Sequence, residues 1–296
     1  PLVPPTQRKA AGPMPPAWDE DELRRICDHV RGFDLRPEVI GLPVSGRILM
    51  GQEGRDEDLD DVVERIAMAG RVGFAVMTWN FTALRASEGY AAQAGAGRGG
   101  AHLRDFDYAR IRDLQPLDDV GRHEMEAMWQ RLEYCLKYIV PAAEAAGVRL
   151  AMHPNDPPVP EYRGVAQPLW NLAAMKRLIE FVDSPANSLF FDTGVTTEYG
   201  DDAAAAIRYF GERDRIGIVH FRNVRVEDSY YKYTETFLDE GECDIVACMR
   251  AFAEVGYEGG IDPDHTPGIS GDTEETQMGW AYAVGQLRAL RLATHR

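Results

Sequence analysis

Four short apolar segments in the second half of the chain each end in a side chain that can bind a metal. They are residues 148–153, 188–192, 216–220 and 259–264, and helix-like stretches separate them. Apolar runs of this length are typical of strands that are covered on both faces. Strands that alternate with helices predict a parallel sheet, and a (β/α)8 barrel carries its functional groups at the carboxyl ends of its strands. We therefore predict an α/β fold, a TIM barrel, with a metal site at that end.

The first half of the chain continues the alternation. We predict strands at residues 35–42 and 73–78, which brings the number of strands to six. Helices are predicted at residues 56–70, 123–146, 168–182, 202–211, 245–255 and 274–293. The glycine- and alanine-rich residues 91–101 have weak periodicity. Because a loop of this length in a compact domain is usually functional, we expect it to close over the site.

Two strands of an eight-stranded barrel remain to be found, and only the residues before 35 are left for them. Residues 1–3 and 10–14 resemble strand remnants. Too few residues separate them for a parallel crossover, which needs at least about a dozen. We therefore predict one TIM-barrel domain over residues 1–296, with a segment omitted near residues 6–11.

Length and charge limit the classes of function. The chain has 296 residues, which is typical of one α/β barrel. Its formal net charge of −16 argues against nucleic acid, because phosphate binding needs clustered Lys and Arg. The sequence has neither a run of about 18 apolar residues nor an apolar leader, so we expect no membrane span and no signal peptide. The four cysteines lack Cys-x-x-Cys spacing, which favours reduced thiols in a cytoplasmic protein.

The four strand ends supply two imidazoles and two carboxylates, which belong to His153, Asp192, His220 and Asp264. Taken singly, each has a structural interpretation: a hydrogen-bonded histidine, a helix N-cap, a salt bridge or a solvated loop. Together, four such groups at successive strand ends favour a metal site. Mixed nitrogen and oxygen ligands suit Mn²⁺, Fe²⁺ or Zn²⁺, and the lack of thiolate ligands argues against a structural zinc.

Other polar residues accompany these strand ends. Arg222 lies two residues after His220, so alternation places both on one face, where a guanidinium suits an anionic substrate; a salt bridge with a neighbouring carboxylate is the structural alternative. Asn80, at the end of an earlier strand, and Glu235, in the loop after the His220 strand, are candidates for substrate contacts. A solvated acidic loop is the alternative for Glu235. His265 begins the last of these loops and is an acid–base candidate.

These segments resemble the mannonate dehydratase family. The resemblance rests on His153-Pro-Asn-Asp-Pro-Pro, His220-Phe-Arg, Glu235 with residues 238–244, and Pro263-Asp-His, and it extends from about residue 35 to the C-terminus. It implies a TIM barrel related to xylose isomerase that uses Mn²⁺ or Fe²⁺ to convert D-mannonate to 2-keto-3-deoxy-D-gluconate. It also implies that His153, His220 and Asp264 are metal ligands and that His265 is an acid–base residue.

Two positions depart from the family pattern. Asp192 stands where the family usually has a cysteine ligand, and a carboxylate is a harder ligand that shifts the preference toward Mn²⁺ or Mg²⁺. The family's catalytic tyrosine lies on the loop that leads into the last helix. Tyr282 is close to this position but out of register. An ordinary helix residue is the alternative for Tyr282. We predict His265 and Tyr282 as the catalytic residues, the first from the resemblance and the second from its nearness to the family's tyrosine position.

We expect the metal-dependent dehydration of a sugar acid, most directly D-mannonate. His265 and Tyr282 would exchange protons, and Arg222 and Arg225 are candidates for holding the substrate carboxylate. Asp192 also favours an alternative, a metal-dependent sugar or sugar-acid isomerase or epimerase of the xylose-isomerase-like group. A non-catalytic barrel that binds a sugar acid is a third interpretation. The acidic charge disfavours an apurinic endonuclease of related fold, and the resemblance leaves a homo-oligomer open.

Overall fold

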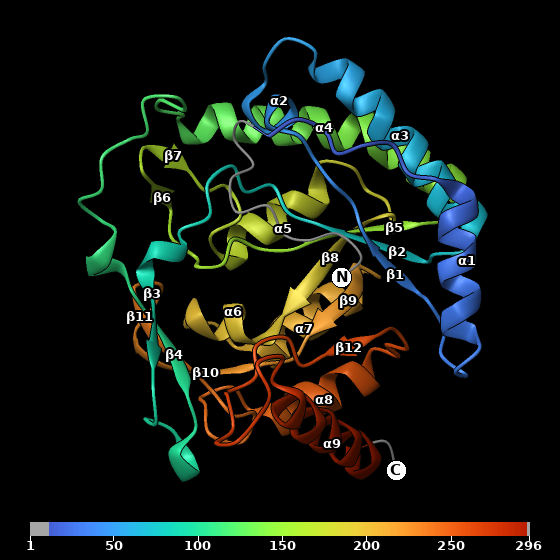
Figure 1. Ribbon diagram of the computed structural model, residues 1–296. Coiled ribbons are helices and arrows are strands. Elements are labelled where there is room, and N and C mark those ends of the chain that lie inside the picture. The colour runs from blue at the N-terminus through green and yellow to red at the C-terminus, as the bar shows by residue number, and fades with distance from the viewer. Residues whose placement is uncertain (1–11, 295–296) are drawn as a thin grey trace.

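The computed structural model describes residues 12–294, and it contains a curved sheet of six parallel strands (Figure 1). In their order along the sheet these are β1 (Val39–Gly41), β2 (Val76–Trp79), β5 (Arg149–Met152), β8 (Asn187–Asp192), β9 (Ile216–His220) and β12 (Ile261–Asp262). Every pair of neighbours in this sheet is parallel. Each strand overlaps one of the six predicted segments, so the α/β prediction is confirmed.

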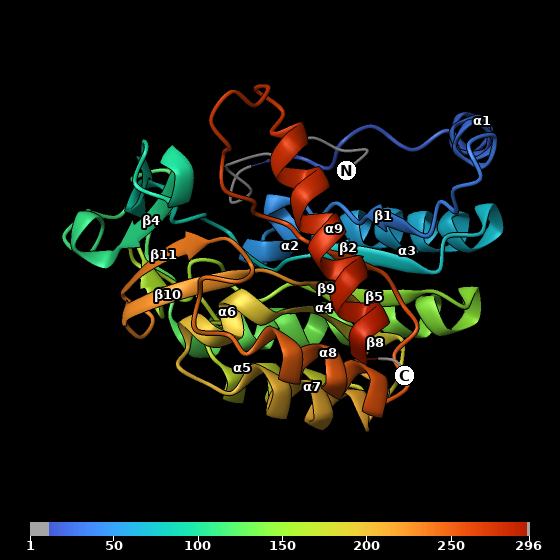
Figure 2. The same ribbon diagram turned by 90° about the horizontal axis from the view of Figure 1, so that it is seen from below.

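Helices lie between the strands and cover the sheet from outside. They are α1 (Glu20–Arg31), α2 (Gly46–Met50), α3 (Arg55–Val72), α4 (Met125–Ala146), α5 (Leu172–Glu180), α6 (Thr193–Glu198), α7 (Ala203–Gly211), α8 (Ile245–Glu254) and α9 (Gln277–Thr294). Figure 2 shows α5, α7 and α8 in one row along the sheet. The six predicted helices correspond to α3, α4, α5, α7, α8 and α9, whereas α1, α2 and α6 were not predicted.

Aspartates set the start of the helices that follow the later strands. The side chains of Asp192, Asp202 and Asp244 each accept a hydrogen bond from the backbone N–H three residues further on. Such N-caps satisfy a backbone donor that has no partner within the helix. The strand β8 therefore ends, and α6 begins, at the same residue, Asp192, which fixes the carboxylate at the barrel mouth.

The parallel sheet ends at β1 and β12 and is not closed among residues 12–294. Residues 12–38 contain α1 and otherwise turns and coil. Residues 12–14, part of one predicted strand remnant, lie outside any strand. The other remnant and the segment near residues 6–11 lie outside the described residues. The single-domain organisation thus stays a proposal.

A second, antiparallel sheet stands beside the barrel, at the left of Figure 1. It consists of β10 (Asn223–Asp228), β11 (Lys232–Thr236), β4 (Leu103–Asp107) and β3 (Tyr90–Gln93), in that order. The prediction of a loop over residues 91–101 is therefore wrong for its first part, which lies in β3. This segment forms a strand because of contacts with distant parts of the chain. Tyr90 packs on Phe106 of the adjacent β4 and on Tyr233 of β11, with ring centroids 5.2 and 6.3 Å away.

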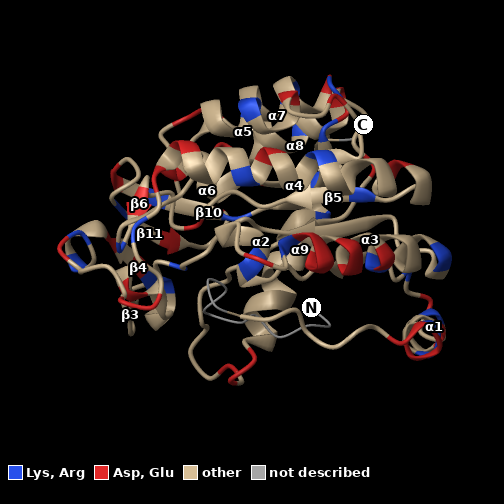
Figure 3. Cartoon of the chain, turned by 90° about the horizontal axis from the view of Figure 1, so that it is seen from above, with Lys and Arg blue, Asp and Glu red and all other residues tan. Residues whose placement is uncertain are grey.

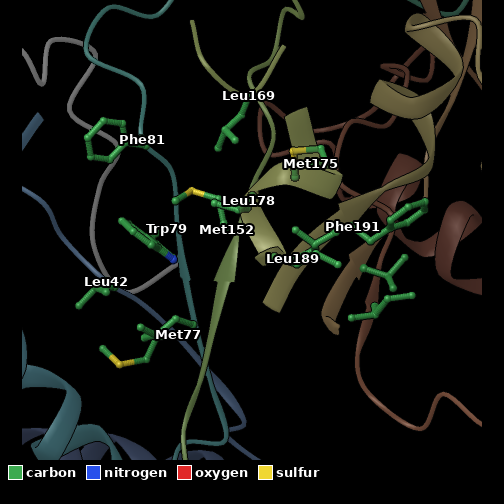
Figure 4. Packing of buried hydrophobic residues seen from close by; sticks show 14 of the residues in the cluster. Leu42, Met77, Trp79, Phe81, Met152, Leu169, Met175, Leu178, Leu189 and Phe191 are labelled. Carbon is green, nitrogen blue, oxygen red and sulfur yellow. The ribbon is translucent and has the colours of Figure 1, made fainter. Parts of the chain in front are cut away.

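Apolar residues fill both sides of the parallel sheet. One cluster lies between the sheet and the helices, and Figure 4 shows part of it, with Met77 and Trp79 of β2 near Met152 of β5. The other lies inside the barrel and consists of Val76, Ala151, Phe190 and Ile218, with Val39 packed against them. Burial on both faces explains why the strands are continuously apolar in sequence.

Charged side chains lie mainly on the outer surfaces. Figure 3 shows acidic residues along α3 and Lys or Arg mixed with Asp and Glu on the helices of the opposite layer. Among the described residues, no helix is both long enough and apolar enough to cross a membrane.

Candidate active site

The pleat of the parallel strands brings the predicted metal ligands together. His153, Asp192 and His220 lie two positions beyond interior residues of β5, β8 and β9, so alternation turns them toward the same interior face. Asp192 is also the direct register partner of His220. Phe190 lies beneath them, with its ring centroid 3.9 Å from that of His220 and 5.1 Å from that of His153. An apolar floor therefore supports a ring of potential ligands.

The ligand atoms of these three residues lie within 4.8 Å of one another. His153 Nε2 is 3.1 Å from His220 Nδ1, and both nitrogens lie near Asp192 Oδ2, at 3.4 and 3.5 Å. Asp264 Oδ2 is 3.4 Å from His220 Nδ1. The four predicted ligands thus converge on one point, and we name His153, Asp192, His220 and Asp264 the ligand cluster.

The surroundings of His153 suit metal binding. Its Nδ1 lies 2.8 Å from the backbone carbonyl of Pro154, which requires a proton on Nδ1 and leaves the lone pair of Nε2 facing the cluster. A carbonyl that accepts the second ring N–H is the usual arrangement around a metal-bound histidine. The donor set of two imidazoles and two carboxylates, free of thiolate, fits Mn²⁺, Fe²⁺ or Mg²⁺ better than a structural zinc.

Arg222 lies directly behind the cluster and is almost fully buried, with 1% of its side chain exposed. Its Nε donates to Asp192 at 3.0 Å, its Nη1 to Glu198 at 2.8 Å and its Nη2 to Asp156 at 3.1 Å. Burial acts to raise the pKa of Asp192, but Arg222 and the two histidines outweigh it and hold that pKa well below its usual value. Each guanidinium nitrogen thus has a carboxylate partner.

The fixed charges around the site do not balance. Five carboxylates face Arg222, namely those of Asp156, Asp192, Glu198, Glu235 and Asp264. Within residues 12–294, one further guanidinium, that of Arg104, joins them through Glu235. Burial and the neighbouring carboxylates raise the pKa of Glu198 well above its usual value, against the opposing effect of Arg222. The carboxylates outnumber the cationic side chains even when His265, which pairs with Glu235 and Asp264, is counted with Arg222 and Arg104. Because buried unpaired charge is costly, a divalent cation fits the site electrostatically.

A cavity of about 270 Å³ adjoins the ligand cluster through Asp264. Arg104, Glu235 and His265 are the other charged or titratable groups near Asp264, Trp280 adds an aromatic wall, and His102, Thr266 and Thr276 are further polar lining residues; we name this cavity the His265 pocket. At about 30 Å³ per water, the volume equals that of roughly nine waters, which suits a small polar molecule.

The polar groups of the pocket bond to one another. His265 Nδ1 lies 3.0 Å from Glu235 Oε1. Arg104 donates to both oxygens of Glu235 through its Nε and Nη2. Burial works to raise the pKa of Glu235, but His265 and Arg104 lower it to about 2. For His265, burial lowers the pKa and Glu235 and Asp264 raise it, with a net increase. In the pair of His265 and Glu235, the pKa of the imidazole is thus raised and that of the carboxyl group is lowered.

The remaining predicted residues lie apart from this pocket. Asn80 directly follows β2 and is partly buried. Arg225 is exposed on β10. Tyr282 lines a neighbouring hollow with Arg98 and Phe237. Its hydroxyl bonds to Arg98 and Gln286 at 3.1 Å each. The structure thus brings His265 and Glu235 together but leaves Arg225 and Tyr282 outside the His265 pocket.

Three functional-site residues were not found from the sequence. Asp156 belongs to the His153-Pro-Asn-Asp-Pro-Pro motif, but the sequence assigns it no role, and no sequence pattern singled out Arg104 or Glu198. Arg104 had one usable signal, because the polar and apolar residues around it in β4 partly alternate, as in a half-buried strand. Glu198 had none, since nothing local distinguishes a buried glutamate at a helix end from an exposed one.

Comparisons with known proteins agree with this geometry. The family model D-mannonate dehydratase (UxuA) matches residues 102–294. A mannonate dehydratase from Streptococcus equi subsp. zooepidemicus is 28% identical over 293 residues, covering 89% of this chain and 79% of the relative. One from Thermotoga petrophila is 27% identical over 318 residues, covering 94% and 88%.

Solved structures confirm the barrel. The crystal structure of mannonate dehydratase from Streptococcus suis serotype 2 superposes with a TM-score of 0.81 at 25% identity, covering 95% of this chain and 84% of that one. A xylose isomerase domain protein from Planctomyces limnophilus gives 0.60 at 15% identity, covering 92% and 84%, which supports the fold alone. The predicted xylose-isomerase-like TIM barrel is thereby confirmed, and the chain belongs to the D-mannonate dehydratase family.

Proposed function

We propose that this protein dehydrates D-mannonate to 2-keto-3-deoxy-D-gluconate with the help of a divalent metal ion. Family membership supports the reaction. The observation that supports it in this chain is the His265 pocket, in which His265 lies beside the ligand cluster because Asp264 belongs to both.

His153, Asp192, His220 and Asp264 would hold the ion, with Mn²⁺ expected and Fe²⁺ or Mg²⁺ as alternatives. When bound, it would supply a Lewis acid that stabilises negative charge on a substrate oxygen. The excess of carboxylates around Arg222 supports a cation at this position.

His265 is the residue that we propose for proton transfer. The C2 proton of the substrate must be removed and the C3 hydroxyl must leave as water, after which the enol gives the 2-keto product. Glu235 bonds to Nδ1 of His265 and so leaves Nε2 as the nitrogen that exchanges protons with substrate. We omit Tyr282 from these steps, because its hydroxyl bonds to Arg98 and Gln286 in another hollow.

A second candidate is an isomerase or epimerase that acts on a sugar or sugar acid. Asp192 favours this candidate, because the resemblance to mannonate dehydratases implies a cysteine ligand at this position and the chain has a carboxylate there. Such an enzyme would exchange the C2 proton with solvent and would not expel a hydroxyl group.

The test is turnover of D-mannonate by Mn²⁺-loaded protein, with 2-keto-3-deoxy-D-gluconate measured as product. We expect product from the wild type and from H123Q, and none from H265A. His123 is a matched control because it bonds to Arg131 and to the Val120 carbonyl and does not line the His265 pocket. Exchange of the C2 proton for deuterium without product would overturn the dehydratase assignment in favour of the second candidate.

A further inference from the structure

Among the residues that the structure describes, Arg104 is the one guanidinium that lines the His265 pocket, and it reaches the pocket from the antiparallel sheet rather than from the barrel. In the register of that sheet, Arg104 lies directly opposite Glu235, and Glu235 lies opposite Val224. Register partners share a face, so these three side chains point to the pocket side of the sheet.

The same register places Arg225 on the other face. Arg225 lies opposite Thr234, which lies opposite Asp105, and each of these residues is adjacent in sequence to a residue of the pocket face. Because successive side chains of a strand point to opposite faces, Arg225 points away from the pocket. Arg222 is also ill suited to a substrate carboxylate, because it is 1% exposed and all three of its guanidinium nitrogens already donate to carboxylates.

The guanidinium of Arg104 is held rigidly and still has unused donors. Its Nε and Nη2 bond to Glu235, its Nη2 also lies 2.8 Å from His265 Nδ1, and its Cζ lies 4.1 Å from the ring centroid of Tyr90. Its Nη1 has no hydrogen-bond partner among residues 12–294, and 39% of the side chain is exposed, in the pocket. A guanidinium that is fixed in advance loses little freedom when it binds an anion.

We propose that Arg104 recognises the carboxylate of the substrate and thereby selects a sugar acid over a neutral sugar. The Nη1 edge donates to the carboxylate, while Glu235 and Tyr90 hold the guanidinium in place. This inference rests on the proposed function for its substrate, and it names the residue that makes the site specific for acids.

The test measures binding without turnover. The acid is 3-deoxy-D-mannonate, which lacks the leaving hydroxyl and cannot be dehydrated, and the neutral ligand is its alditol, in which a CH₂OH group replaces the carboxylate. Mn²⁺-loaded protein is titrated with each by calorimetry. We expect the wild type to prefer the acid, and R104Q to bind the acid about 10- to 100-fold more weakly, the range for a hydrogen bond to a charged group, with the alditol unaffected.

Three further variants keep the result interpretable. R112Q is the matched control, because Arg112 is exposed and pairs only with its neighbour Asp113; it should behave as wild type. R104K keeps the charge without the planar fork and should retain part of the preference. The double variant R104Q/E235Q removes the carboxylate that R104Q leaves without its partner, so loss of preference in a folded double variant again supports the proposal.

Several outcomes would overturn the proposal. In R104Q, these are an equal loss of affinity for the acid and the alditol, or an unchanged preference for the acid. Loss of the preference in R225Q instead, or a wild type that binds both ligands equally, would also overturn it. The proposed function fails separately: a wild type that prefers the acid but produces no keto-deoxy acid from D-mannonate would refute the dehydratase assignment and leave acid recognition by Arg104 intact.

Discussion

Replacing Arg222 by methionine tests whether the buried charges were assigned correctly. The substitution keeps most of the side-chain volume and removes the guanidinium from three carboxylates, those of Asp192, Glu198 and Asp156, whose side chains are 0%, 0% and 4% exposed. Removing one partner of a buried ion pair costs about 3–5 kcal/mol. The pKa of Glu198 is raised, whereas those of Asp156 and Asp192 are lowered. Chiefly these two aspartates therefore lose a charge partner, and we expect the free energy of unfolding to fall by about 5 kcal/mol, the upper end of that range.

The loss should depend on pH in a defined direction. In the wild type, the pKa values of Asp156 and Asp192 are lowered, because Arg222 outweighs burial. Their stabilisation is thus present above an unfolded pKa of about 3.9 and is lost only as pH falls through the lowered values. Without Arg222, burial raises the folded pKa values, and the folded variant takes up protons that the unfolded chain does not. The difference in free energy of unfolding between wild type and R222M should therefore become smaller as the pH falls from 7.5 to 5.5.

Urea unfolding in EDTA measures these differences, because a bound cation would offset part of the loss. R65M is the control: Arg65 is equally buried but bonds to Asp61, which is one-third exposed, and to the carbonyls of Pro15 and Pro16. Its removal should cost about 1.5–3 kcal/mol, with little change between these pH values. A loss for R222M below about 2 kcal/mol, or a difference that does not become smaller as the pH falls, would refute the charge assignment.

Three other outcomes are expected. D192N keeps an oxygen for the α6 cap but removes the ligand charge, so calorimetry should give at least about 10-fold weaker Mn²⁺ binding; unchanged affinity would contradict the ligand cluster. E198Q replaces Glu198 by a neutral side chain of the same shape, which imitates the protonated form that a raised pKa favours. Urea unfolding should therefore give a free energy of unfolding within about 1 kcal/mol of wild type, and a loss as large as that of R222M would mean that Glu198 is ionised. The four cysteines should react with Ellman's reagent only after denaturation, because all are buried. They are Cys27, Cys135, Cys243 and Cys248.

The barrel and its ligand cluster could be predicted because both follow from local patterns. Apolar runs indicate strands, a period of 2 decides which way His220 and Arg222 point, and the carboxyl ends of parallel strands meet at one edge. His153, Asp192, His220 and Asp264 converge for these reasons alone.

The pocket walls could not be predicted because they depend on pairing between distant segments. Arg104 is 131 residues from Glu235, and Arg222 is 66 residues from Asp156. Alternation placed Arg222 on the face of His220, yet the carboxylates that bond to its guanidinium come from the end of β8, the end of α6 and the loop after β5. The same limit applies to Tyr282, whose hydroxyl meets Arg98, 184 residues away.

On the roles proposed above, the two sheets carry different parts of the site. The ligand cluster belongs to strand ends of the barrel, whereas Arg104 belongs to β4, within residues 90–107 that leave the barrel after β2 and return before α4. Substitutions in residues 90–107 would then change which substrates bind without moving any residue of the ligand cluster. On these roles, a graft of residues 90–107 between related barrels should transfer substrate preference, while Mn²⁺ affinity stays that of the recipient.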